Sequence, residues 1–155
     1  VKATNNLQEK SADFCRKDKL SPEELPTYWA WKQREAFEYN GMVLHEYYFG
    51  NLTKQSSSSP RDDSRFFSIA DRSFGSYALW KADFIRIGSL RGVGWAICYE
   101  DPRSNLISNH WISLHENGHV ADLQPILVMD IWEHAYLLDY KPVGLMAAVR
   151  WRTRR

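Results

Sequence analysis

A serine-rich segment, Lys54-Gln55-Ser56-Ser57-Ser58-Ser59-Pro60, divides the chain into two parts with different patterns. Four serines followed by a proline lack the apolar side chains that a packed helix or strand requires. We therefore predict a domain boundary here, with a helical domain over residues 1–58 and a second domain over residues 59–155. The length of 155 residues allows one domain or two small ones.

The part before this segment has helical patterns. Residues 1–20 are polar with scattered apolar positions and predict a helix. Ser21-Pro22-Glu23-Glu24 is typical of a helix start, with Ser as the N-cap, Pro in the first turn and Glu at the third position. A long apolar-periodic stretch then predicts a helix over residues 25–52.

The part after it predicts helices followed by strands. We expect a short helix over 62–70, a turn over 71–76, and a second helix capped by Ser76, in which apolar residues recur every three or four positions. Three apolar segments bounded by turn residues predict strands over 92–99, 106–114 and 125–130. The third is apolar on both faces, so we expect it to be buried, and residues 131–140 predict a helix after it. The fold class is α+β.

Composition excludes several classes of function. A net charge of +1 gives no field that would attract nucleic acid or an acidic membrane, and we expect neither as a partner. No apolar run approaches the length of a membrane span. Cys15 and Cys98 form no paired motif, which predicts two free thiols in a reducing, cytoplasmic compartment, with a single long-range disulfide as the alternative.

Asp130 and His134 are the first candidate site residues. Asp130 ends an apolar strand, and His134 follows four positions later, so that the two side chains can point into one cavity. A carboxylate and an imidazole that converge beside apolar surface suit a metal ion. The alternative interpretation is that Asp130 caps a helix and that His134 is an ordinary surface or core histidine.

Four further positions bear on this site. His45 lies among apolar residues of the long helix, where an imidazole needs a hydrogen bond or a ligand. With Asp130 and His134 it would form a three-ligand set with open positions, which favours iron, manganese or zinc. His115 is either a donor to a metal-bound water or a loop histidine in solvent. Aromatic residues could line a cavity or belong to the core; these are Trp95 and Trp132.

Several motifs now point to one family. Asp130-Ile131-Trp132-Glu133-His134-Ala135-Tyr136 resembles the D-x-W-E-H-A-[YF] signature of iron/manganese superoxide dismutases. Upstream segments resemble the family's H-x-x-[FY]-[FW]-x-N-L, F-G-S and G-x-G-W motifs; they begin at His45, Phe74 and Gly92, respectively. The resemblance spans about residues 1–141. It implies a helical hairpin followed by an α/β domain with a three-stranded antiparallel sheet and flanking helices.

The resemblance also implies roles for these residues. His45, Asp130 and His134 would be three of the family's four ligands to one iron or manganese ion per chain. His115 would hydrogen-bond the metal-bound solvent, and Trp95 and Trp132 would wall the cavity. Glu133 would pair with the ligand histidine of a partner subunit in a homodimer or tetramer. The implied activity is a superoxide dismutase, which converts superoxide to dioxygen and hydrogen peroxide by redox cycling of the metal.

The sequence departs from the family pattern at three places. The fourth ligand, a histidine on the family's first long helix, has no counterpart here, and we expect the chain to begin just past that helix segment. Leu137 stands where most members have a tyrosine, and the segment after Pro142 is shorter than expected. These departures leave an inactive superoxide-dismutase-like structural or interaction module as the main alternative. A zinc hydrolase that uses the same residues is a weaker one.

Overall fold

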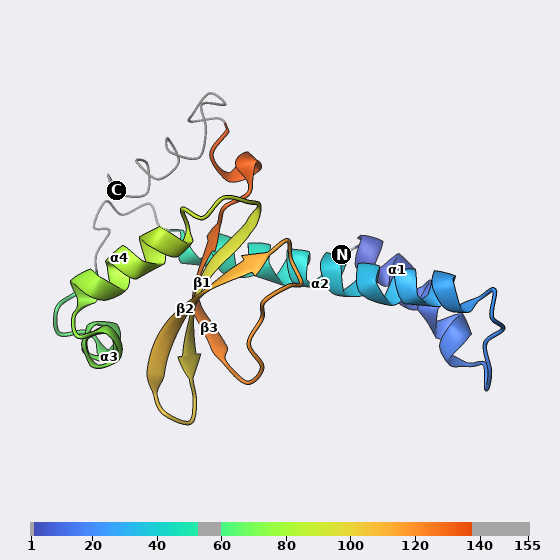
Figure 1. Cartoon of the computed structure of the whole chain (residues 1–155), viewed down its shortest axis with the longest axis horizontal. Coiled ribbons are helices and arrows are strands. Elements are labelled where there is room, and N and C mark those ends of the chain that lie inside the picture. Colours follow the sequence, from blue (N-terminus) through green and yellow to red (C-terminus); the bar gives the residue numbers. More distant parts are fainter. Residues whose placement is uncertain (1, 53–59, 138–155) are drawn as a thin grey trace.

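The computed structural model of the chain describes residues 2–52 and 60–137 and has the predicted α+β fold (Figure 1). A hairpin of two helices precedes a smaller pair of helices and an antiparallel sheet. The elements in chain order are α1 (Lys2–Cys15), α2 (Leu25–Asn51), α3 (Arg65–Phe74), α4 (Tyr77–Ile87), β1 (Gly94–Asp101), β2 (Leu106–Ser113), β3 (Gln124–Asp130) and the 3-10 turn η1 (Glu133–Ala135).

The long helix α2 joins the two parts of the structure. Its first half packs along α1, and its second half crosses the sheet, where it contacts β3 (Figure 1). The helix expected over residues 25–52 is confirmed as Leu25–Asn51, but the predicted N-cap at Ser21 is wrong. Ser21 lies in a turn before the helix, where its backbone N–H donates to the Glu24 carboxylate at 3.0 Å, and Glu24 takes the N-cap position without a side-chain cap.

The helices α3 and α4 begin at serine caps. Ser76 Oγ accepts the backbone N–H of Leu79 at 3.1 Å, which confirms the predicted cap of α4. The expectation for α3 is wrong at both ends, because Ser64 caps it and Gly75 stops it. Gly75 has a φ of +84°, a left-handed conformation that ends helices and that glycine adopts without steric cost.

The sheet has the strand order β2-β1-β3, and both pairings are antiparallel. The three predicted strands are confirmed, but the expectation that β3 is buried is wrong, because only Val128 and Asp130 are buried and its other residues are half-buried or exposed. β1 lies in the centre and buries its first six residues, whereas β3 is an edge strand. An apolar strand sequence indicates that other elements cover the two faces of the strand, but it does not indicate that the strand has a hydrogen-bonded neighbour on each side. On the open edge, the Val128 backbone N–H donates to Asn51 Oδ1 of α2 at 2.8 Å.

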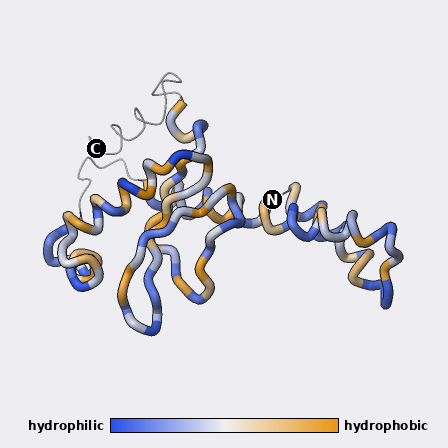
Figure 2. Tube along the Cα trace, viewed as in Figure 1, coloured by the Kyte–Doolittle hydropathy of each residue, from blue (hydrophilic) through white to orange (hydrophobic). Residues whose placement is uncertain are grey.

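The two faces of the sheet hold separate apolar clusters. Ala96 and Cys98 face α3 and α4, where Trp80 and Phe84 pack. The alternate residues of β1 face α2 and pack with Leu44; they are Trp95, Ile97 and Tyr99. Hydrophilic residues gather at the tip of the β1–β2 hairpin, away from both clusters (Figure 2).

The segment after β3 differs from the expected helix over residues 131–140. Ile131 N–H donates to the Gly94 carbonyl at 3.0 Å, so the chain still pairs with β1 at this point. Asp130 Oδ1 accepts the N–H of Trp132 at 2.8 Å, and a single 3-10 turn follows. Residues 138–140 lie outside the described residues, as does the predicted boundary between residues 58 and 59. In the described ranges, no helix is both long and apolar enough to cross a membrane.

Candidate metal centre

Three predicted site residues from distant parts of the sequence converge beside α2. His45 comes from the second half of that helix, Asp130 from the last position of β3, and His134 from η1. The distance between His134 Nε2 and Asp130 Oδ2 is 2.9 Å, between the two histidine Nε2 atoms 3.4 Å, and between His45 Nε2 and Asp130 Oδ2 3.7 Å. One donor atom from each residue therefore faces a single point.

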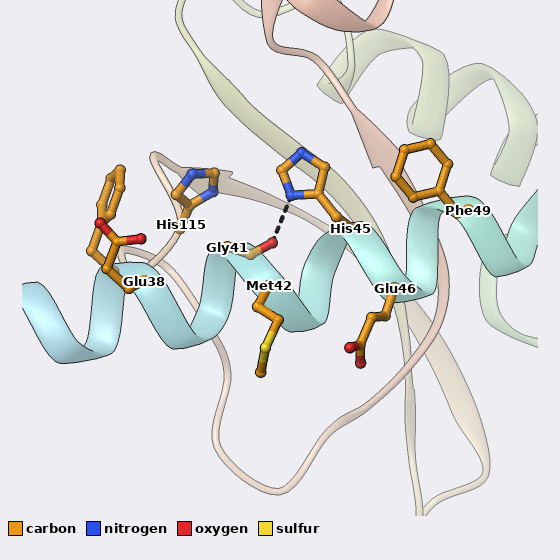
Figure 3. A pocket seen from close by; sticks show the side chains of 8 residues that line it. Glu38, Gly41, Met42, His45, Glu46, Phe49 and His115 are labelled. Atoms are coloured by element: carbon orange, nitrogen blue, oxygen red, sulfur yellow. Dashed lines mark hydrogen bonds between the residues drawn. The ribbon is translucent and has the colours of Figure 1, made fainter. Parts of the chain in front are cut away.

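The orientation of His45 is set within its own helix. Its Nδ1 lies 2.6 Å from the carbonyl oxygen of Gly41, one turn earlier (Figure 3). A carbonyl can only accept, so Nδ1 carries the proton. In the neutral ring, Nε2 then presents an unprotonated lone pair to Asp130 and His134, as a metal ligand must.

Asp130 supplies a buried negative charge. Its side chain is 1% exposed, and its ion-pair partners are the imidazoles of His45 and His134. A buried carboxylate is costly unless cationic or hydrogen-bonding groups compensate it. Oδ1 is satisfied by the Trp132 N–H. Oδ2 faces only the two histidines in the described part of the chain, and a cation bound there would compensate its charge.

The spacing of the three donors fits one metal ion. Two donors that are each about 2.1 Å from a shared ion lie about 3.0 Å apart at a right angle and about 3.6 Å apart at 120°. The three observed separations, 2.9, 3.4 and 3.7 Å, fall close to this range. Two histidines and one carboxylate with open positions are the donor set of many iron sites. The residues thus fit an ion of this class.

His115 is buried next to this cluster, contrary to the alternative of a loop histidine in solvent. It is 8% exposed, and its ring stacks on Trp132 with centroids 4.9 Å apart. Trp95 Nε1–H donates to His115 Nδ1 at 3.0 Å. Burial, assisted by nearby His45, lowers the pKa of His115 and favours the neutral ring. Since Nδ1 accepts, the neutral ring carries its proton on Nε2.

A cavity of about 450 Å³ opens beside His45 and His115, which lie on the same side of α2 (Figure 3). Trp95 is fully buried and meets the His45 ring edge-on, at 4.9 Å between centroids. Trp132 lies between the rings of His115 and His134. The two tryptophans therefore contact all three histidines of the site.

Glu133 and Leu137 lie at the solvent-exposed end of the site. Glu133 is exposed beside His134 on η1. Leu137 is 48% exposed just beyond it. The pairing of Glu133 across a subunit interface stays a prediction.

Gly41 and Phe37 belong to the site but are missing from the sequence-based prediction. Gly41 provides the carbonyl that orients His45, and a Cβ at this position would lie 3.1 Å from His115 Cδ2. The Phe37 ring packs edge-on against His115 at 4.5 Å. A glycine inside a long helix, one turn before a candidate ligand, is a signal that could have identified Gly41, because glycine destabilises a helix interior.

Fold and site together define an α+β protein in which two histidines and one carboxylate converge between a long helix and an antiparallel sheet. A model of the family "Iron/manganese superoxide dismutases, C-terminal domain" matches residues 63–144, just over half of the 155-residue chain. The chain belongs to the iron/manganese superoxide dismutase family.

Curated relatives agree with this assignment. A "Superoxide dismutase [Fe]" from Pyrobaculum aerophilum is 32% identical over 107 residues, which cover 68% of this chain and 51% of the relative. A "Superoxide dismutase [Fe]" from Cupriavidus metallidurans is 34% identical over 70% of this chain and 54% of the relative. A "Superoxide dismutase [Mn] 1" from Haloferax mediterranei is 34% identical over 66% and 69%, respectively. The chain thus spans about half the length of the two iron relatives.

Proposed function

We propose that this chain forms the larger part of the active site of a superoxide dismutase, with His45, Asp130 and His134 as ligands to one iron or manganese ion. The observation that carries the proposal is the convergence of their three donor atoms, 2.9 to 3.7 Å apart, around a buried carboxylate. Family membership supports the same assignment.

The proposed ligands differ in charge, because one is an anionic carboxylate and two are neutral imidazoles. An ion held by these residues would supply one-electron chemistry between its divalent and trivalent states, by which one superoxide would be oxidised to dioxygen and a second, together with two protons, would be reduced to hydrogen peroxide. The Asp130 carboxylate favours the higher charge, and the neutral imidazoles of His45 and His134 favour it less. Gly41 keeps the His45 lone pair directed at the site.

His115 is the polar group that the site directs at bound solvent or substrate. Its Nε2–H donor faces the cavity side of α2, 3.3 Å from the point where a Gly41 Cβ would lie. Such a donor holds a bound water in place and tunes its acidity. Trp95 and Trp132 exclude bulk water from this side, which strengthens every polar interaction within the site.

The finer parts of the proposal concern assembly and location. Glu133, His134 and Leu137 lie exposed at one end of the site, and we infer a homodimer or tetramer in which Glu133 meets His134 of a second copy. The free thiols of Cys15 and Cys98 support a reducing, cytoplasmic compartment. The net charge of +1 supports neither a nucleic acid nor an acidic membrane as partner.

The test is a superoxide dismutation assay on the native full-length protein, loaded separately with iron and with manganese. Activity that depends on one of these metals is expected. Asp130→Asn should reduce that activity strongly, whereas the same change at Asp63, which lies before α3 with a 76% exposed side chain, should leave it within about twofold. Stoichiometric metal without dismutation would instead support the alternative of an inactive structural or interaction module.

A further inference from the structure

We infer that His119 is a positioning residue for this site, acting through the backbone of His115, an inference that rests on the proposed function. His119 Nε2 lies 2.9 Å from the carbonyl oxygen of His115, and its Nδ1 lies 2.9 Å from the hydroxyl of Tyr99. His119 therefore connects Tyr99 of the central strand β1 to the backbone of His115.

The direction of this hydrogen-bond chain follows from its end. The His115 carbonyl can only accept, so His119 Nε2 carries the proton, and in the neutral ring Nδ1 accepts from the Tyr99 O–H. Tyr99 is 3% exposed, and burial raises its pKa to about 12, which keeps the phenol protonated. The His115 carbonyl therefore fixes the tautomer of His119, and the protonated Tyr99 hydroxyl holds the other ring nitrogen of His119 in place.

His115 needs such support because it lies outside the sheet. β2 ends at Ser113, and Leu114 then adopts a φ of +57°, which is uncommon for a residue other than glycine and persists only where the surroundings enforce it. The His115 N–H donates to the side chain of Glu116 at 3.1 Å, and the nearest backbone pairing is the bridge between Ser113 and Asn117 on either side of it. The bond from His119 fixes the remaining backbone group.

The consequence concerns the Nε2–H donor of His115. The ring is clamped by Trp95, Trp132 and Phe37, so a displaced backbone would tilt the ring rather than translate it freely. Supporting residues of this kind typically contribute 10- to 100-fold to metal affinity or activity. We expect an effect near the lower end, about tenfold, since His119 acts at one remove.

The experiment compares His119→Phe with His119→Gln. Phe keeps a ring but removes the donor, and a cavity of about 200 Å³ beside His119 and Tyr99 gives it room. Gln places an amide N–H near the position of Nε2 and should restore the bond. His110→Gln is the matched control, because His110 also contacts the Tyr99 ring but reaches only Ser108 with its Nε2.

Two readouts separate positioning from general damage. Nuclear magnetic resonance of the metal-free native protein reports the His115 carbonyl ¹³C and ring ¹⁵N shifts, and dismutation is measured on the metal-loaded protein. We expect His119→Phe to move the His115 signals and to lower the rate about tenfold, with His119→Gln and His110→Gln close to the wild type. Unmoved His115 signals in His119→Phe, or a His119→Gln variant as impaired as His119→Phe, would overturn the inference.

The same experiment distinguishes this inference from the proposed function. A wild-type protein that binds metal but does not dismutate superoxide would refute the proposed function. The His115 shifts of the metal-free protein would still respond to His119→Phe if the hydrogen-bond chain positions His115 as inferred.

Discussion

Replacing Gly41 by alanine tests how closely α2 must approach His115. A Cβ at this position would lie 3.1 Å from Cδ2, 3.3 Å from Nε2 and 3.4 Å from Cγ of the His115 ring. Ordinary carbon contacts lie at about 3.5 to 4.0 Å, so the ring must retreat by about 0.5 Å. Trp132 and Phe37 pack against the ring and resist that movement.

Two effects of Gly41→Ala on stability oppose each other. Alanine stabilises a helix interior by up to about 1 kcal/mol relative to glycine, and the contact with His115 offsets part of this gain. Gly50 provides the control for close approach, because it lies in the last turn of the same helix and its Cβ would meet nothing within 4 Å. Each substitution should therefore raise the melting temperature by no more than about 2–4 °C.

The two variants should differ in superoxide dismutation activity, which Gly41→Ala should lower. A misplacement of about 1 Å can cost 10²-fold in rate, so a shift of half that size predicts a loss of about tenfold for Gly41→Ala. Gly50→Ala should retain the wild-type rate. The assays are thermal unfolding and superoxide dismutation on the metal-loaded native protein. A Gly41→Ala variant that matches Gly50→Ala in both assays would refute the argument from close approach.

Three further predictions follow from burial and hydrogen bonding. Cys98 is fully buried, and burial raises its pKa to about 12, so a thiol reagent near pH 8 should label only exposed Cys15 until the protein unfolds; labelling of both in the native state would contradict this. Burial lowers the pKa of His115, so the unfolded state takes up a proton on this residue first as the pH falls below about 6.5. The free energy of unfolding should therefore fall more steeply in the wild type than in His115→Gln when the pH is lowered from about 7.5 to about 5.5. Equal slopes for the two proteins in thermal melts over this range would count against the argument. Asn51→Ala leaves the buried Val128 N–H without its partner and should cost about 1–3 kcal/mol in denaturant unfolding; a loss below about 0.5 kcal/mol would show that the bond is unimportant.

Local patterns predicted most of the secondary structure. The long helix and the Ser76 cap were predictable because both depend on residues that are close together in the sequence. The position of β3 does not, because an apolar run is the same for a central strand and for an edge strand covered on both faces. Here the Asn51 side chain accepts the Val128 N–H at the edge of the sheet, and no local sequence pattern predicts that contact.

The candidate ligands were predictable from motif and spacing, whereas their support was not. His45, Asp130 and His134 stand in recognisable patterns, and the structure brings their donor atoms together. The expected helix after Asp130 was wrong, yet the 3-10 turn still directs His134 to the same point. Gly41 and His119 act through backbone carbonyls, and the partner of a carbonyl depends on tertiary structure rather than on residue type.

Metal binding is the most direct test of the proposed ligands His45, Asp130 and His134. The most direct measurement is the metal content of the native full-length protein and of its Asp130→Ala, His134→Ala and His110→Ala variants, determined by elemental analysis on folded, purified samples. We predict about one iron or manganese ion per chain in the wild type and in His110→Ala, and loss of the metal in the other two variants. Full retention of metal in Asp130→Ala or His134→Ala would contradict the assignment of the site.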